Sequence, residues 1–147
     1  DGTIVCAGMA LGLQGIAGCI LAGEPADTEG YMGRNLVLQD VTAVSSGCMM
    51  IRKDLFLEVG GFTQGLSGLF RDLDLCLKVQ ESGRKVVLDP GVKVCGGTPQ
   101  EHTGDRASRA YIQKRWRERL RRGDPYFSRN LSGKDPSCVP GEAERKE

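Results

Sequence analysis

The sequence predicts an α/β fold in which helices pack against a mixed sheet. First, a helical pattern at residues 70–82 is followed by short apolar segments at 84–88 and 92–95. Second, 21 of the 147 residues are glycine, about twice the usual share, which indicates many tight turns. Third, aromatic residues make up only 5%, so the core must be aliphatic. The length fits one domain or one half of a larger one.

Charge and composition exclude several classes of protein. Lys and Arg number 20 and Asp and Glu number 19, which gives a formal net charge of +1. This balance excludes a strongly basic nucleic-acid-binding protein and an acidic disordered chain. The glycines follow no Gly-X-Y period, so the chain is not collagen-like. We therefore expect a globular chain and no nucleic-acid partner.

Residues 2–23 carry no charge, and their length and hydropathy suit a transmembrane helix. However, six of these residues are glycine, each costing about 1 kcal/mol relative to alanine in a helix, and Gln14 lies among them. No Lys or Arg precedes the stretch, so a secretory leader is not expected. We predict a short strand at residues 3–6 followed by a glycine-rich loop, with a spanning helix as the weaker alternative.

The cysteine pattern favours a reducing compartment. Six cysteines lie at positions 6, 19, 48, 76, 95 and 138, and no two have CxxC spacing. A zinc ribbon or a thioredoxin-like motif is therefore not expected. Cys48 and Cys76 lie in apolar runs and are interpreted as small buried side chains rather than disulfide partners. We expect a cytoplasmic protein.

Before residue 70 the pattern predicts a loop, a strand and a short helix. Residues 24–40 are polar and rich in turn-forming residues, which is typical of a surface loop. Residues 41–51 are a strand candidate, interrupted at 45–47 by a bulge or a backbone contact. A short helix follows at 52–59, with Asp54 as its expected N-cap and two glycines as its stop.

After residue 70 two helices are predicted. Residues 70–82 show helical spacing of apolar side chains, and Gly83 is a typical C-terminal stop. Residues 107–122 form a long basic helix, with eight Arg or Lys against one acid over 106–122. Trp116 on this helix is interpreted as a core anchor or, alternatively, as a neighbour of an anionic ligand. Residues 133–147 lack an apolar period and predict a disordered tail.

Asp72 and Asp74 are the most informative pair of polar residues. Both lie near the start of the predicted helix 70–82, where the helix dipole favours ionised carboxylates. Side chains two residues apart point to different sides of a helix, so the two should have different roles. One could face a cleft while the other pairs locally, with Arg71 or Lys78. The alternative is that both only satisfy the helix terminus.

Other side chains give little support for chemistry. His102 is the sole histidine and lies in a polar loop, where a solvated side chain is expected. Because no second His or acid has metal-ligand spacing with it, we expect no metal site built from this chain alone. The serines lack a base partner for a hydrolase triad, and the glycine-rich stretches lack phosphate-loop spacing.

Five motifs then follow one another in order. The chain opens with DGTIVCAGMALGLQGIAG and continues with AVSSGCMMIRKDLFLEVGGF and GLFRDLDLCLKVQESGRKVVLDPG. It ends with YIQKRW and GDPYFSRNLS. In this order, over roughly residues 1–132, they resemble the C-terminal, acceptor-side half of family 2 glycosyltransferases of the GT-A fold. The resemblance implies a partial GT-A-like mixed sheet with flanking helices that lacks the N-terminal nucleotide-binding half.

The resemblance also implies a reaction, an inverting transfer of sugar from a nucleotide-sugar donor to an acceptor hydroxyl. Asp72 would be the general base that deprotonates this hydroxyl, with Asp74 and Arg71 as supporting residues. This role requires an Asp72 carboxylate that faces an open crevice and is not held by Arg71. The residues expected to bind the acceptor are Gly47, Gly60, Gly61 and Trp116.

The resemblance further implies Mg²⁺ or Mn²⁺, with ligands mostly outside this chain. The expected partners are the donor and a saccharide or lipid-linked acceptor, and membrane-surface association or a homo-oligomer is compatible with them. Three departures stand out. Arg71 replaces an acid and should weaken Asp72 as a base. Thr63 replaces another acid, and Cys95 stands near the place of a histidine, with His102 further along.

Two alternatives to an enzyme remain. One is a binding or interaction module that is derived from the same fold and has no catalytic activity. The other is binding to an anionic surface through the basic helix 107–122.

Overall fold

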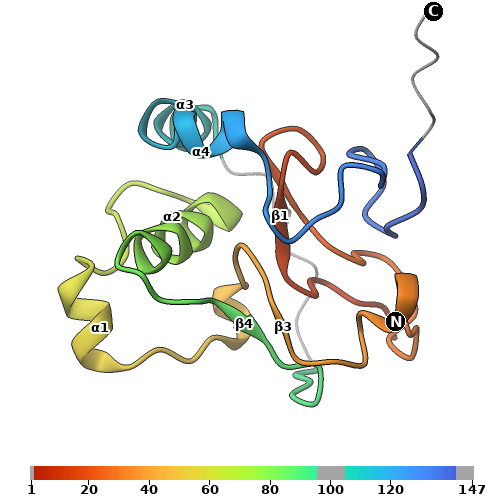
Figure 1. Ribbon diagram of the computed structural model, residues 1–147. Helices are drawn as coiled ribbons and strands as arrows, with labels where there is room; N and C mark the ends of the chain where they lie inside the picture. Colours follow the sequence, from red (N-terminus) through yellow and green to blue (C-terminus); the bar gives the residue numbers. More distant parts are fainter. Residues whose placement is uncertain (1, 96–104, 142–147) are drawn as a thin grey trace, which may run out of the picture.

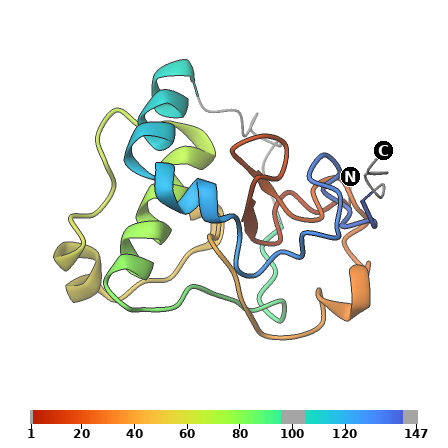
Figure 2. The ribbon, with the colours of Figure 1, turned by 45° about the horizontal axis from the view of Figure 1, so that its top comes forward.

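The computed structural model describes residues 2–95 and 105–141, and within them the chain forms a mixed α/β fold. Two small antiparallel sheets and four α-helices make up this described part (Figure 1). The helices gather on one side, whereas β1 and the C-terminal segment lie on the other (Figures 1 and 2). His102, discussed above, lies outside the described residues.

The uncharged N-terminal stretch folds as a hairpin. Strand β1 (Met9–Leu11) pairs antiparallel with β2 (Ala17–Cys19), so the strand predicted at 3–6 is wrong in position. Both strands are buried throughout, because Met9 and Leu11 face one apolar cluster while Ala10 faces another. A strand covered on both faces shows no apolar–polar alternation, which explains the misplacement. No helix in the described ranges is long and apolar enough to cross a membrane.

The second sheet is smaller than predicted. It consists of β3 (Gln39–Asp40) paired antiparallel with β4 (Val87–Leu88). The strand predicted at 41–51 is replaced by an isolated bridge from Ala43 to Met9 and a 3₁₀ turn, η2 (Ser46–Cys48). The strand predicted at 92–95 is absent from this described segment, whose valines are exposed and gain nothing from pairing. Most of the loop 24–40 is irregular, apart from the 3₁₀ turn η1 (Tyr31–Gly33) and β3.

Two of the predicted helices are confirmed with shifted ends. Helix α1 (Lys53–Glu58) starts after Arg52, so Asp54 lies in its first turn and is not the N-cap. Helix α2 (Gly68–Glu81) presents buried side chains on several faces and stops before Gly83, which has a positive φ of 78°. The buried side chains of α2 form a large part of the main apolar cluster of the fold.

The basic helix is broken in two. Helix α3 (Arg106–Arg115) and helix α4 (Arg117–Arg122) are separated at Trp116, whose φ of −110° and ψ of 20° are not helical. The single helix predicted over 107–122 is therefore wrong at this residue. Asp105 caps α3 by accepting a hydrogen bond from the backbone N–H of Ser108. Figure 2 shows the pair of helices lying against α2.

Residues 133–141 are ordered, which corrects the predicted start of the disordered tail. The carbonyl of Gly133 accepts a hydrogen bond from the N–H of Gln14, and Leu21 donates to the carbonyl of Pro136. Cys138 is fully buried in a second apolar cluster that also contains Leu131. The C-terminal segment thus covers the face of the β1–β2 hairpin that α2 does not.

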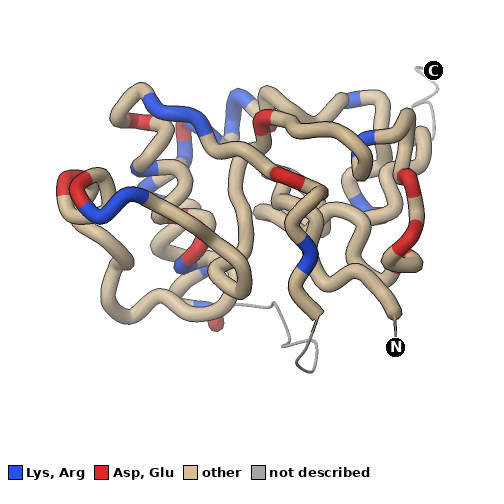
Figure 3. The backbone as a smooth tube through the Cα atoms, turned by 90° about the horizontal axis from the view of Figure 1, so that it is seen from below, with Lys and Arg blue, Asp and Glu red and all other residues tan. Residues whose placement is uncertain are grey.

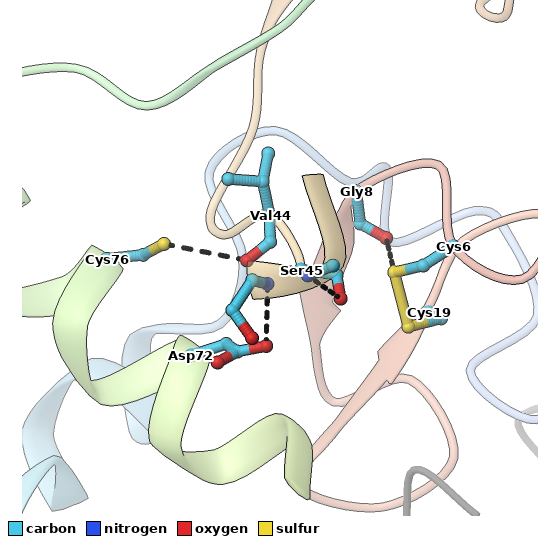
Figure 4. Close-up of a disulfide and its surroundings, with 9 residues drawn as sticks. Cys6, Gly8, Cys19, Val44, Ser45, Asp72 and Cys76 are labelled. Atoms are coloured by element: carbon cyan, nitrogen blue, oxygen red, sulfur yellow. Dashed lines mark hydrogen bonds between the residues drawn. A yellow bond between two sulfur atoms is a disulfide. The ribbon is translucent and has the colours of Figure 1, made fainter. Parts of the chain in front are cut away.

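The cysteines also differ from expectation. Cys6 and Cys19 form a disulfide with a Cα–Cα distance of 4.9 Å, next to the hairpin (Figure 4). Cys76 is buried and unpaired as predicted, whereas Cys48 is exposed rather than buried. The disulfide was not predicted, because the spacing of these two cysteines matches no motif.

Candidate functional site

The candidate site is the meeting point of α2 and the η2 turn. Asp72 lies in the second turn of α2, and its Oδ2 accepts a hydrogen bond of 2.8 Å from the backbone N–H of Ser46 (Figure 4). These residues are 26 positions apart in the chain. The contact joins two of the sequence motifs, and it agrees with the backbone contact predicted at 45–47.

Arg71 covers the other side of the same carboxylate. Its Nε lies 3.3 Å from Asp72 Oδ1, and its Nη2 donates a 2.8 Å hydrogen bond to Ser46 Oγ. The guanidinium also lies over the ring of Phe62, 5.1 Å from the ring centre. The Arg71 side chain is 43% exposed. The arginine therefore forms the solvent-facing surface of the site.

These contacts shield the Asp72 carboxylate from solvent. Asp72 is only 4% exposed, with one oxygen engaged by Ser46 and the other by Arg71. The requirement stated above for a general base, an open carboxylate that is free of Arg71, is not met in this arrangement. Any proton transfer through Asp72 needs Arg71 to move first.

Asp74 lies two residues further along and is buried completely. Its Oδ1 accepts a 2.8 Å hydrogen bond from the indole N–H of Trp116. Its Oδ2 accepts one of 2.6 Å from Thr63 Oγ1 and lies 2.9 Å from the ammonium of Lys78. Lys78 also donates to the carbonyl of Gly61. Asp74 thus ties α2 to the 61–63 turn and to the α3–α4 junction.

The residues predicted to bind an acceptor are divided between surface and core. Gly47 and Gly60 are exposed, whereas Gly61 and Trp116 are buried. The indole N–H of Trp116 is used by Asp74, so the structure places this residue in the core and gives it no atom to offer a ligand. This corrects the acceptor-binding assignment of Trp116 and supports its interpretation as a core anchor.

The buried thiol beside the site, that of Cys76, is unreactive. Cys76 lies one turn beyond Asp72 on α2, and its Sγ is 3.9 Å from the carbonyl of Val44 (Figure 4). Burial, together with a smaller effect of the Asp72 carboxylate, raises the pKa of Cys76 to about 11. A thiol of this kind stays protonated at neutral pH, so it packs the η2 segment against α2 and has no nucleophilic role.

The two aspartates do not fit a divalent metal ion. Across the described ranges, no three His, Cys, Asp or Glu side chains converge as ligands. Asp72 and Asp74 also have their oxygens taken by N–H and O–H donors, and each has a cationic neighbour. A cation would have to displace Arg71 or Lys78 to bind there. We therefore assign no step of a reaction to a metal held by these residues.

A surface hollow of about 350 Å³ lies near α1, the C-terminal end of α2 and the end of α3, and Asp72 is not among its lining residues. Its walls are Glu58, Val59, Lys78, Glu81, Ser82 and Arg115. Its mixed charges favour no particular ligand.

Sequence reasoning missed three members of these networks. Ser46 and Thr63 contribute through a backbone N–H and a hydroxyl, which leave no strong signal in a single sequence. Phe62 contributes the aromatic face under Arg71. The pairing of Asp74 with Lys78 is the exception, because its i, i+4 spacing on a helix could be read in advance.

Comparison with known proteins adds one relative. No family model matches the chain, and no solved structure matches it. The chain is 32% identical over 142 residues to an uncharacterized protein, y4gI, from Sinorhizobium fredii. The match covers 90% of this chain and 16% of that protein, so the chain spans about one sixth of the relative's length. The relative's printed name states no activity.

Proposed function

We propose that the chain is the acceptor-side portion of an inverting glycosyltransferase that uses a nucleotide-sugar donor. The motifs at 41–62, 70–90 and 111–132 support this proposal through their resemblance to family 2 glycosyltransferases. The observation that carries it is the hydrogen bond between Ser46 and Asp72, because it joins the first two motifs at the predicted base. Donor binding would belong to a further part of the full-length protein.

In this proposal Asp72 is the general base and Arg71 is its movable cover. The arrangement described above is the closed state. The Arg71 side chain is nearly half exposed, whereas that of Asp72 is only 6% exposed. Rotation of Arg71 away from the carboxylate gives up its contacts with Asp72, Ser46 and Phe62, so in this proposal the bound acceptor must replace them. Ser46 continues to orient Oδ2, and Oδ1 becomes free to accept a proton from the acceptor hydroxyl.

The first test is sugar transfer by the full-length protein with Asp72→Asn. Removal of a general base lowers the rate by about 10²–10⁴-fold, so we expect a loss in this range. Asp89→Asn is the matched control, because Asp89 is an exposed acid outside the site. A variant at position 72 that transfers sugar at the wild-type rate removes Asp72 from the catalytic role.

The closed carboxylate also favours a second candidate, a binding or interaction module without catalysis. In that case the contacts of Asp72 with Ser46 and Arg71 only hold η2 against α2. Asp72→Asn would then lower stability and leave any transfer rate of the full-length protein unchanged. Titration of the 147-residue chain with nucleotide sugars is a further check, because measurable affinity would place the donor site on this chain, contrary to both candidates.

A further inference from the structure

The positive charge of the chain is concentrated in one segment. Residues 105–129 contain nine Lys or Arg and three acids, whereas the rest of the chain contains eleven and sixteen. The near-neutral total therefore hides a basic region and an acidic remainder. Figure 3 shows that on the face seen from below the two signs are interspersed. The basic region lies on α3 and α4, which are at the top in Figure 1.

The apolar side of these helices is already used. Ser108, Ile112 and Trp116 follow one another at intervals of four residues and are all buried. A helix that buries one side presents its other side to solvent, and the spacing places Arg106 and Lys114 on that opposite side. Arg117 begins α4 immediately after the break. The solvent-facing side of the two helices is therefore cationic.

Six of these nine cations form no ion pair among the described residues, and three of the six also make no side-chain hydrogen bond and no cation–π contact there. Arg115 pairs with Glu81, and Glu118 holds Arg121 and Arg122. By contrast, Arg106, Lys114 and Arg117 are exposed and take part in no salt bridge or side-chain hydrogen bond of the described part. These three residues, which we call the free basic face, carry charge that the fold does not use internally.

The surroundings of the free basic face indicate the kind of partner. Tyr111 lies three residues before Lys114 on α3 and is 37% exposed, and tyrosine is a side chain that favours the boundary between apolar and aqueous phases. The exposed side of a helix offers no groove of the sort in which single-stranded nucleic acids are held with stacked bases. Cations on such an exposed helix side, with a tyrosine close by, are suited to a sheet of phosphate headgroups.

We propose that the free basic face docks the protein on an anionic phospholipid surface. The contact is peripheral and electrostatic, because the apolar side of α3 stays buried in the protein core. Each basic side chain near such a surface contributes about fivefold to binding. The contribution falls as salt rises, because the surface potential is screened within about one Debye length. This inference is independent of the role of Asp72.

The test is sedimentation of the 147-residue chain with vesicles of phosphatidylcholine containing about one third phosphatidylglycerol. The variant Arg106→Gln/Lys114→Gln/Arg117→Gln should bind about 100-fold more weakly, and binding of the wild type should weaken as salt is added. The matched control is Lys53→Gln/Arg84→Gln/Lys134→Gln, which removes the same charge from exposed positions outside α3 and α4 and should bind nearly as the wild type does. Thermal unfolding of both variants checks that each is folded.

Four results would overturn the proposal. The first is an absence of wild-type binding to anionic vesicles at low salt. The second is equal binding to vesicles of pure phosphatidylcholine. The third is an equal loss of binding in the control variant, which would indicate a general charge effect. The fourth is salt-sensitive binding to a single-stranded or duplex oligonucleotide in place of vesicles, which would assign the face to nucleic acid.

Discussion

At the scale of single residues, two aspartates on one helix have opposite environments. Asp72 lies under the half-exposed side chain of Arg71, whereas Asp74 is fully buried between three partners, Trp116, Thr63 and Lys78. The difference follows from their spacing, because residues two positions apart point to different sides of α2. In the proposed function only the first would become available to a substrate, and the second stabilises the structure around it.

Asp74→Asn should destabilise the protein strongly. Removal of one charge from a buried pair costs about 3–5 kcal/mol, because Lys78 keeps its charge in a largely buried place. Asp54→Asn is the control, since its ion pair with Arg52 is exposed and should contribute less than about 1 kcal/mol. Chemical denaturation measures both. Equal losses in the two variants would show that the Asp74 network does not stabilise the fold.

The acid Asp105 gives a pH-dependent prediction. Hydrogen bonds from the backbone of Ser108 and the hydroxyl of Ser67 hold the pKa of Asp105 below its ordinary value. A lowered folded-state pKa means that its stabilising contribution is complete above the ordinary carboxyl pKa of about 3.9 and is lost as the pH falls through the lowered value.

The free energy of unfolding of the wild type should fall as the pH is lowered, in part because Asp105 becomes protonated. We therefore expect a smaller fall at acid pH in the Asp105→Asn variant. Asparagine also caps helices, so the free energy of unfolding at pH 7 should change little. Unfolding measured between pH 2 and pH 7 tests this. If the variant loses as much unfolding free energy at acid pH as the wild type does, the titration of Asp105 does not contribute to the stability of the fold.

At the scale of elements, a segment could be predicted from the sequence where local residue patterns determine it, and could not where contacts with distant parts of the chain do. Helix α2 could be predicted, because its periodicity and the glycine after it are local signals. The β1–β2 hairpin could not, because both of its faces are buried and the alternation that marks a strand is missing. Trp116, where the basic helix breaks, forms a hydrogen bond to a residue 42 positions away, and no local pattern contains such a contact.

The turn after α1 contains two adjacent glycines that are required for different reasons. Gly60 and Gly61 both have positive φ, 81° and 61°. A Cβ on Gly60 would meet nothing within 4 Å, whereas one on Gly61 would lie 2.9 Å from the Phe56 ring. The first position therefore needs glycine only for its backbone conformation. The second needs it for space as well.

Gly60→Ala should cost about 1–2 kcal/mol, the penalty of a left-handed conformation for a residue with a Cβ. Gly61→Ala should cost more, by about a further 1–3 kcal/mol, because the Phe56 ring must shift. Denaturation curves of the two variants compare them directly. A Gly61 variant as stable as the Gly60 variant would contradict the close contact with Phe56.

At the scale of the whole molecule, the hairpin β1–β2 separates two apolar clusters, one under the helices and one under the C-terminal segment. The disulfide between Cys6 and Cys19 lies beside this hairpin. Disulfides are rare in reducing compartments, so this pairing disagrees with the cysteine argument for a cytoplasmic protein. The candidate site at η2 and the free basic face on α3 and α4 belong to the helical side.

The residues of the candidate site could be predicted from the sequence, but whether the Asp72 carboxylate is open or covered could not. Local spacing singled out Asp72, Asp74 and the turn at 45–47. The closure of the carboxylate depends on the rotamer of Arg71 and on the position of Phe62, which only the folded chain defines. Sequence reasoning therefore singled out Asp72 and could not tell whether its carboxylate is accessible.

The central claim is that Asp72 is a base covered by Arg71, and sugar transfer by the full-length protein tests it most directly. The wild type, Asp72→Asn and Arg71→Ala should be compared under the same conditions with a labelled nucleotide sugar. The account predicts a loss of about 100-fold or more for Asp72→Asn and an unchanged or higher rate for Arg71→Ala. Equal rates for the wild type and Asp72→Asn would contradict it.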